Sequence, residues 1–331
     1  MAVERVASLG RPKLGHRIFR ALSGEYFWFY LLLLPSVVIL LGVVIIPMLY
    51  ALKMSLGNTS VVVIGGHGSV QSTFVGLANY VALMQNPAFW QALRETLYFW
   101  VVSIGLELTV GIGMALVLNQ KFWGQKVVRV LVFIPWAVPT VVNAMLWGMI
   151  LNGNDYGVLN DLLLRLHWIR TPVVWLTPTP VFQGVPWLSH SLGALGSNLA
   201  MNAIIVGDEW KTLPIVAILV LAGLQMVPAE YYEAARVEGA SWVSQFFRIT
   251  LPLVGPILTV VLILRTMQLL RAFTLVYTLE GYGLPLLSIS AYQQAFSFGA
   301  FGPGSATAFI IGMIALVIAY FYIKRLYREV L

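Results

Sequence analysis

The 331-residue chain contains no cysteine, and its four histidines are scattered over an N-terminal arm and loops. Without cysteine, disulfides, thiolate metal sites and cysteine nucleophiles are excluded. The sequence has no HExxH pair and no GxSxG motif, so neither a zinc protease nor a serine hydrolase is indicated. No Gly-Lys dipeptide occurs, which excludes a phosphate-binding P-loop. We therefore expect no catalysis, no metal site and no cofactor in this chain.

Charge is scarce as well. Only 10% of the residues are charged and 59% are hydrophobic, with a mean hydropathy of +0.85. A soluble globular protein of this size needs more polar surface, so the composition predicts an integral membrane protein. A helix needs about 20 apolar residues to cross the hydrocarbon core, and backbone polar groups in lipid must be satisfied within the segment. Six stretches fit and are expected to be helices: Tyr26–Ala51, Phe89–Leu118, Val127–Leu151, Met201–Gln225, Pro252–Tyr277 and Pro303–Ile323.

Basic residues gather in short segments, which predicts how the spans are oriented. They lie in the N-terminal arm, residues 1–25, in the turn between the second and third spans, and in the C-terminal tail. By the positive-inside rule these segments, and so both termini, are expected in the cytoplasm. The long segments 53–88 and 152–200 are poor in lysine and arginine and are expected outside. Because this topology accounts for the net charge of +7, we do not expect nucleic-acid binding.

The segment between the fourth and fifth spans, residues 229–251, is amphipathic but interrupted at Gly239. Glycine takes a positive φ without steric cost, so Gly239 can end one short helix and let the chain turn into another. Small alanines around the turn keep it narrow enough for a partner to approach the backbone. Pro252 suits the start of the next span, where its missing N–H is not needed. An ordinary interfacial hairpin is the alternative interpretation.

The same segment carries EAARVEGA at 233–240, then eight residues, then ITLP at 249–252. This resembles the signature loop of the membrane subunits of bacterial ABC importers, EAA-x2-DGA-x8-IxLP, with every spacing kept. Glu238 stands where that family usually has aspartate. We call residues 229–251 the EAA loop. The residues that match its motif are Glu233, Ala234, Ala235, Glu238, Gly239, Ala240, Ile249, Leu251 and Pro252.

Further segments are similar to the maltose-type carbohydrate permeases of this family. They are FVGLANY at 74–80, FWQALRETL at 89–97, FIPWAVP at 133–139 and the segment 210–225, which together span most of 74–328. Two features depart from the pattern. Glu95 replaces a usual asparagine, and TLEGYGLP at 278–285 replaces a glycine-richer outer turn.

The resemblance implies an all-α, polytopic membrane protein with six transmembrane helices and the type I ABC importer permease fold. Residues 26–331 would be the permease domain, with an outer cap at about 152–200 and the EAA loop as its cytoplasmic coupling loop. The implied location is the cell inner membrane. The implied partners are a homologous second permease, an ATPase dimer that binds ATP and Mg²⁺ and receives the EAA loop in a cleft, and an extracytoplasmic solute-binding protein. Membrane lipid is expected around the spans.

Ionisable side chains within the spans are candidates for the substrate pathway, because charges in a membrane usually face a bundle interior or a water-filled path. Glu107 and Arg265 are both expected near mid-membrane, where they could meet, whereas Asp208 and Lys211 are expected at the depth of Arg271. Structural ion pairing is one interpretation. Hydrogen bonding to sugar hydroxyls is the other. The candidate residues are Glu107, Arg265, Gln268 and Arg271.

Prolines and tryptophans give weaker predictions. Pro135, Pro139 and Pro214 each remove a helical hydrogen bond and are expected to bend their helices, either to open a cavity or simply to pack. The outer cap is rich in proline and tryptophan, which favours an irregular segment with short helices, including one near 156–166. Its tryptophans are expected to anchor the segment at the membrane interface or to contact a binding protein.

Two other functional classes fit less well. An ion-coupled secondary transporter would normally show inverted repeats and discontinuous helices around an ion site, and the sequence shows no convincing internal repeat. An intramembrane enzyme lacks the motifs it would need. Co-purification with an ATPase separates the first alternative from a permease.

Overall fold

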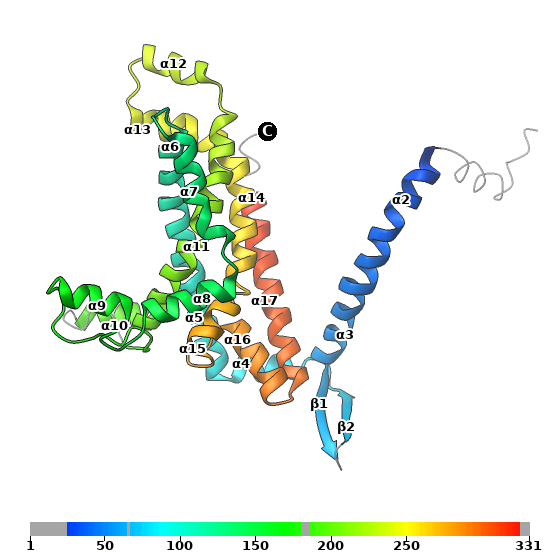
Figure 1. The fold of residues 1–331 in the computed structure, drawn as a ribbon. Helices are drawn as coiled ribbons and strands as arrows, with labels where there is room; N and C mark the ends of the chain where they lie inside the picture. The colour runs from blue at the N-terminus through cyan, green and yellow to red at the C-terminus, as the bar shows by residue number, and fades with distance from the viewer. Residues whose placement is uncertain (1–24, 65–66, 180–185, 325–331) are drawn as a thin grey trace, which may run out of the picture. The chain divides into compact units, whose positions relative to one another are not determined.

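The computed structural model describes residues 25–64, 67–179 and 186–324 (Figure 1). The chain divides into two units, residues 1–53 and 54–331. The predicted N-terminal arm and most of the basic C-terminal tail lie outside the described residues.

The described residues of the first unit belong to one long apolar helix. It consists of α2 (Glu25–Ile39), the π-helical turn η1 (Leu40–Ile45) and α3 (Ile46–Ser55), whose last two residues fall in the second unit. Within it, Phe29–Ser55 is long and apolar enough to cross a membrane. This agrees with the first predicted span.

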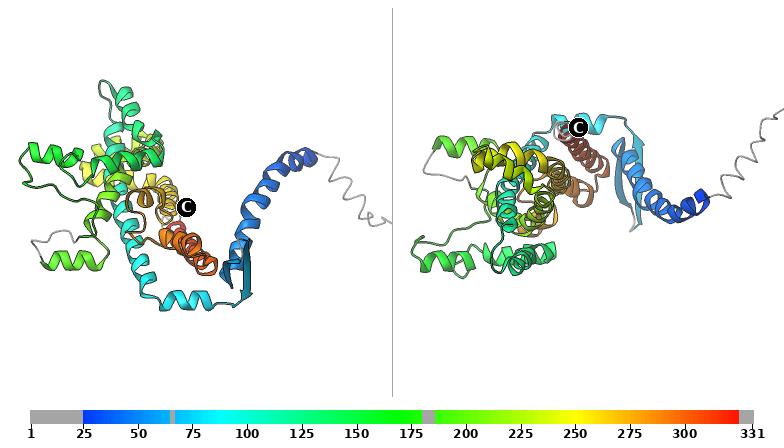
Figure 2. Two further views of the ribbon diagram at one scale, coloured as in Figure 1. Left: turned by 60° about the horizontal axis from the view of Figure 1, so that its bottom comes forward. Right: turned by 90° about the horizontal axis from the view of Figure 1, so that it is seen from above.

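The second unit is a helical bundle with one hairpin (Figures 1 and 2). Its elements are β1 (Gly57–Ile64), β2 (His67–Phe74), α4 (Ala78–Gln85), α5 (Pro87–Leu106), η2 (Glu107–Gly111), α6 (Ile112–Asn119), α7 (Gln125–Ala137), α8 (Thr140–Ile150), α9 (Val158–Arg165), α10 (Pro186–Ala194), α11 (Leu199–Gln225), α12 (Ala229–Val237), α13 (Trp242–Gln245), η3 (Phe246–Thr250), α14 (Leu251–Leu269), α15 (Thr274–Glu280), α16 (Leu287–Tyr292), η4 (Gln293–Ser297) and α17 (Phe301–Tyr322).

Four stretches of the described chain are long and apolar enough to cross a membrane, or up to six if each of two bent helix pairs counts as one span. The second predicted span appears as α5, η2 and α6, which continue into one another from Pro87 to Asn119. The sixth appears as α17. The fourth appears as α11, which stays helical through Pro214.

The third predicted span, Val127–Leu151, is broken rather than continuous. Helices α7 and α8 meet at 93°. Val138 between them is extended, with ψ at 127°, and Pro139 caps α8. A proline disfavours the α conformation at the preceding residue, so Pro139 explains the break, whereas Pro135 lies inside α7.

The fifth predicted span, Pro252–Tyr277, begins earlier than expected. Helices α13, η3 and α14 run without interruption from Trp242 to Leu269, and α15 follows after a short break. Pro252 is therefore not the start of the helical run. The wider π-helical turn η3 comes directly before α14, where the proline cannot donate to the ladder.

A β-hairpin that the sequence analysis did not predict lies in the first long outer segment. Strands β1 and β2 pair antiparallel, from Gly57 opposite Phe74 to Ile64 opposite His67. The start of α17 packs against β1. A Cβ at Gly302 would lie 2.4 Å from the carbonyl oxygen of Gly57, so only glycine permits this approach.

The segment 152–200 contains the predicted short helix, here α9, and is organised by one asparagine. Asn160 is fully buried and donates from Nδ2 to the carbonyl oxygens of Asn152, Asn154 and Val173. Its Oδ1 accepts from the indole N–H of Trp175 at 3.0 Å. Trp175 is thus part of the internal framework, while Trp168 is 75% exposed and free to serve as an anchor. The side chain of Trp187 lies outside the described residues.

Helix α11 is the centre of the bundle. It packs against α5, η2, α6, α7 and α14. One apolar cluster surrounds its first half, around Met201, Ile204 and Ile205, and a second surrounds its second half, around Val216 and Val220. Between the two clusters α11 carries Asp208, Glu209 and Lys211. The apolar packing therefore fixes the position of the charged segment.

Candidate functional site

The EAA loop forms a turn between two short helices, as predicted. Helix α12 ends at Val237, and Gly239 has φ at +80°. The N–H of Gly239 donates to the carbonyl oxygen of Arg236 at 3.1 Å, and that of Ala240 donates to Ala235 at 2.8 Å. This pair of bonds is a Schellman motif. No atom lies within 4 Å of the position that a Cβ at Gly239 would take, so this residue is needed for its backbone conformation.

The second arm of the loop is capped and tied to the first. Ser241 caps α13 by accepting from the N–H of Ser244. The hydroxyls of Tyr232 and Thr250 are hydrogen-bonded at 3.0 Å, and Gln245 donates to the carbonyl oxygen of Ala240 at 2.8 Å. These hydrogen bonds connect α12 and the turn to the second arm of the loop. The turn can therefore move as one piece with α14.

The motif residues differ in exposure. Ala235 of α12 is buried, whereas Glu233, Ala234, Glu238 and Gly239 are exposed. Ala240, Ile249 and Leu251 are half-buried, and Pro252 is exposed. In Figure 1, α12 stands beyond the ends of α6, α7 and α11, and the right-hand view of Figure 2 looks onto this end of the bundle.

Large apolar side chains are exposed on the same loop. Tyr231, Val237, Trp242 and Phe247 are 54%, 89%, 68% and 60% exposed. Trp242 stacks on Phe246 with ring centroids 6.1 Å apart. Such a group of apolar residues around a rigid turn is typical of a surface that binds another protein or an interface.

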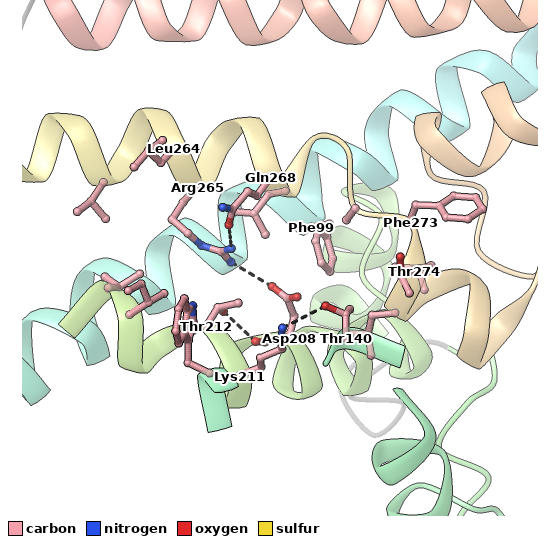
Figure 3. Close-up of a pocket in the computed structure, with 18 of the residues that line it drawn as sticks. Phe99, Thr140, Asp208, Lys211, Thr212, Leu264, Arg265, Gln268, Phe273 and Thr274 are labelled. Carbon is pink, nitrogen blue, oxygen red and sulfur yellow. Dashed lines mark hydrogen bonds and ion pairs between the residues drawn. The ribbon is translucent and has the colours of Figure 1, made fainter. Parts of the chain in front are cut away.

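The second group of candidates meets in the interior of the bundle, around Arg265 of α14 (Figure 3). Arg265 donates from Nε and Nη2 to Oε1 of Glu107, each at 2.5 Å, and from Nη2 to Oδ2 of Asp208 at 3.1 Å. Its Nη1 donates to Oε1 of Gln268 at 2.5 Å. The predicted meeting of Glu107 and Arg265 is confirmed.

Two residues depart from their expected depth. Asp208 joins Arg265 instead of lying beside Arg271, because α11 crosses α14 at this level. Arg271 is exposed and donates to the carbonyl oxygen of Met267, one turn back on its own chain. It does not join the cluster. Sequence spacing gives distances along each helix but not the level at which two helices cross.

The cluster forms one wall of a central cavity of about 440 Å³. Asp208, Lys211, Arg265 and Gln268 line it together with residues from α8 and from the start of α15. Lys211 donates to the hydroxyl of Thr140 at 3.1 Å, across the α7–α8 break. Trp136 and Thr140, on either side of the break, both line the cavity, so the break lies at its wall. Figure 3 shows the polar side chains of α11 and α14 facing one another across this space.

Buried carboxylates adjoin the cluster. Glu209 is 4% exposed, and neither of its carboxylate oxygens has a hydrogen-bond partner among the described residues. Oε2 of Glu107 is also buried without a partner. Glu95, the departure from the family pattern, is buried and accepts from Gln91 at 3.0 Å. Glu209 lies in the fourth predicted span, but the sequence pattern gives no sign that its carboxylate is buried.

Comparison with known proteins places the sequence among transport proteins. Residues 107–329 match the family described as "binding-protein-dependent transport system inner membrane component". The chain is 36% identical, over 89% of its length and 92% of the relative's, to the trehalose/maltose transport system permease protein MalF of Thermococcus litoralis. It is 30% identical, over 89% of its length and 87% of the relative's, to the trehalose transport system permease protein SugA of Mycobacterium tuberculosis.

The fold has a solved counterpart. A chain of a bacterial ABC transporter involved in the import of the acidic polysaccharide alginate matches with a TM-score of 0.72 and 21% identity. The match covers 94% of this chain and 99% of that one. At this identity the likeness concerns the fold, and it agrees with the expected permease fold. On these grounds the chain belongs to the family of binding-protein-dependent transport system inner membrane components, the permease subunits of ABC importers.

Proposed function

We propose that this chain forms half of the translocation pathway of an ATP-driven, binding-protein-dependent importer for a carbohydrate. The carbohydrate substrate is supported by relatives named for trehalose, maltose and sulfoquinovosyl glycerol transport. The chain itself would perform no catalysis. ATP and Mg²⁺ would be bound by a separate ATPase dimer.

The EAA loop is the proposed contact with that ATPase, and its rigid turn is the observation on which the proposal depends. A loop that transmits a movement from one subunit to another must keep its own conformation while it moves. The Schellman turn at Gly239 and the Tyr232–Thr250 hydrogen bond stiffen the loop, while α13 continues through η3 into α14. Movement of the loop would thus pass along α14 to Arg265 in the central cavity. Exposed Glu233 would make polar contacts in the ATPase cleft.

The central cavity is the proposed site of substrate passage. Arg265 already donates to Glu107, Asp208 and Gln268, so its first role is to hold these side chains in place. Lys211 and Gln268 keep further N–H groups that can donate to sugar hydroxyls, and Asp208 can accept. Arg271, exposed on the same helix end, remains a candidate for the pathway in the assembled importer.

The assembly would include three kinds of partner. A homologous second permease would complete the pathway, and an extracytoplasmic binding protein would deliver the solute to the side opposite the EAA loop. In this proposal the EAA loop and both termini lie in the cytoplasm, which the positions of the basic segments support. Lipid would surround the spans in the inner membrane, and no role for nucleic acid is proposed.

Uptake into proteoliposomes tests the proposal. The chain is reconstituted with its second permease and ATPase, and labelled trehalose is supplied with the cognate binding protein. We expect accumulation that needs internal ATP and is lost when either the ATPase or the binding protein is omitted. Accumulation driven by an ion gradient without the ATPase would identify a secondary transporter and contradict the proposal.

A further inference from the structure

A second pocket is lined by elements that lie at the end of the bundle opposite α12 in Figure 1. It has a volume of about 420 Å³, within the range of small-molecule sites. Its walls come from α4, the start of α5, α16, η4 and the start of α17. It shares no lining residue with the central cavity. The proposed function therefore does not account for it.

The lining of this pocket combines polar and apolar residues and carries no charge. Among the described residues that line it, none is acidic or basic. Six amide or hydroxyl side chains line it beside eight apolar residues, which include Phe89 and Phe298. We call it the amide pocket, after Asn79, Asn86, Gln91, Ser290, Gln293 and Gln294.

Existing hydrogen bonds fix which atoms of these amides remain available. Asn79 is 9% exposed and donates both Nδ2 protons, to the carbonyl oxygens of Ser55 at 2.8 Å and Gly57 at 2.9 Å, which leaves Oδ1 as an acceptor. Gln91 donates from Nε2 to Glu95 and also keeps its oxygen as an acceptor. These two residues thus offer acceptors.

Two other amides are oriented the opposite way. Oδ1 of Asn86 accepts from the N–H of Ala88 at 2.9 Å, and Oε1 of Gln294 accepts from the hydroxyl of Thr307 at 3.3 Å. Their NH₂ groups remain as donors. Gln293 and Ser290 make no side-chain hydrogen bond within the described chain and can act either way. The pocket lining therefore offers both donors and acceptors but carries no formal charge.

The frame of the pocket is tightly packed. A Cβ at Gly304 of α17 would lie 2.9 Å from both the carbonyl oxygen of Ala291 and the Cβ of Ala295, so α17 lies directly against α16 and η4. On the other side, Gly302 packs against Gly57 and Asn79. The π-helical turn η4 places Gln293 and Gln294 side by side in the wall, and such turns are frequent at functional sites. The donors and acceptors are thus held in position before any ligand arrives.

We infer that the amide pocket is a second binding site for an uncharged, polyhydroxylated ring such as a pyranose. Each sugar hydroxyl is both donor and acceptor, which matches amides of both orientations. The pocket offers an ion no countercharge, and the rings of Phe89 and Phe298 can contact the C–H face of a sugar. Because it lies on the proposed outer side, it would hold the solute outside the central cavity. Both the choice of a sugar as the probe and the placement of the pocket on the outer side rest on the proposed function.

The absence of native cysteine allows a direct test. Gln293→Cys is introduced into the chain, which is purified with its second permease and ATPase in nanodiscs free of glycosylated lipids and sugar detergents. The rate of labelling by a small maleimide is measured with trehalose and with glycine betaine at equal osmolality. When two thirds of the sites are filled, trehalose should slow labelling about threefold, since the free fraction falls by 1 + [L]/Kd. Betaine should have no effect.

Matched variants complete the experiment. Gln85→Cys, on the exposed side of α4 and outside the pocket, should label at the same rate with and without trehalose. Adding Gln294→Leu, or Ser290→Phe to fill the pocket, should abolish the protection of Gln293→Cys while the ATPase still co-purifies. Equal protection by betaine, or protection that survives both variants, would overturn the inference. Protection by an added glycosyl diacylglycerol but not by trehalose would assign the site to lipid instead.

A third cysteine separates this inference from the proposed function. Thr274→Cys reports on the central cavity, which Thr274 lines. Protection of Thr274→Cys but not of Gln293→Cys would overturn the second site and leave the proposed function intact. Protection of Gln293→Cys in a complex that shows no ATP-dependent uptake would support the site and contradict the proposed function.

Discussion

Arg265 joins side chains from three helical segments, η2, α11 and α14. In a membrane an unpaired charge is far more costly than an absent pair. The arrangement is asymmetric, because Glu107 contacts one cation whereas Arg265 contacts two carboxylates. Removing the arginine leaves one buried and one half-buried carboxylate without their cation, and removing Glu107 leaves Arg265 still paired with Asp208.

The first prediction concerns this cluster. Arg265→Gln should destabilise the complex by about 3 kcal/mol and Glu107→Gln by less, and the double variant should be more stable than the sum of the single losses predicts. Thermal unfolding of the purified complex measures the three values, and trehalose uptake is recorded in parallel. Additive losses would show that the two residues are not coupled. Normal stability with failed uptake in Arg265→Gln would instead give the arginine a role in binding substrate.

The second prediction concerns Gly239. An L-residue in the left-handed region costs about 1 to 2 kcal/mol, and the space around Gly239 is open, so any loss must come from the backbone. Gly239→Ala should reduce ATPase co-purification, Gly239→Val should reduce it further, and Gly239→Asn should retain more, while membrane insertion stays normal. Gly113→Ala is the matched control, because Gly113 also has open space but lies in α6. Full ATPase retention by Gly239→Val would contradict the assigned role of the turn.

Among the elements, the α7–α8 break is the clearest case in which one residue sets the geometry. Val138 is held extended by the proline that follows it, and the 93° bend brings Thr140 to Lys211. Trp136 before the bend and Thr140 after it both line the central cavity.

The third prediction follows from that break. Spin labels at Val130 and Met149, both exposed, report the angle between α7 and α8. At 1.5 Å per residue a straight helix would separate the two backbones by ~29 Å, against ~20 Å for a right-angled bend. Pro139→Ala should shift part of the distance distribution toward the longer value in pulsed electron spin resonance. An unchanged distribution would show that packing, and not the proline, holds the bend.

Sequence patterns predicted some elements well and others not at all. The spans and the turn at Gly239 were predictable, since apolar length and glycine conformation are local properties. The β-hairpin at Gly57–Phe74 was missed, because the low lysine and arginine content of this segment was used to predict its side of the membrane and not its secondary structure. The early start of the fifth helix was also missed, since a π-helical turn leaves no simple pattern in the sequence. The crossing of α11 and α14 at Asp208 depends on tertiary packing and could not be read from either helix.

For the whole molecule, the fourth prediction tests the orientation. Ser189, in the segment 152–200, and Ser244, in the EAA loop, are expected on opposite sides of the membrane. In the cysteine-free chain, Ser189→Cys should react with an impermeant thiol reagent from outside intact cells. Ser244→Cys should react only in inverted vesicles. Labelling of both from the same side would refute the assigned topology.

Coupling to an ATPase through the EAA loop is what separates an ATP-driven permease from a self-sufficient transporter. Ala234 is exposed on α12, beside the rigid turn, and its side chain is small enough to be replaced by a labelled cysteine. A benzophenone attached to Ala234→Cys, in the complex reconstituted with ATPase and binding protein, captures whatever contacts the loop. Ser189→Cys, in the outer segment, serves as the control.

We expect the Ala234 probe to crosslink the ATPase, with a yield that differs between the ATP-bound and nucleotide-free complexes, and the Ser189 probe never to do so. A transport-competent complex in which the Ala234 probe captures the binding protein, or captures no ATPase in either nucleotide state, would contradict the proposal that this loop couples ATP hydrolysis to transport.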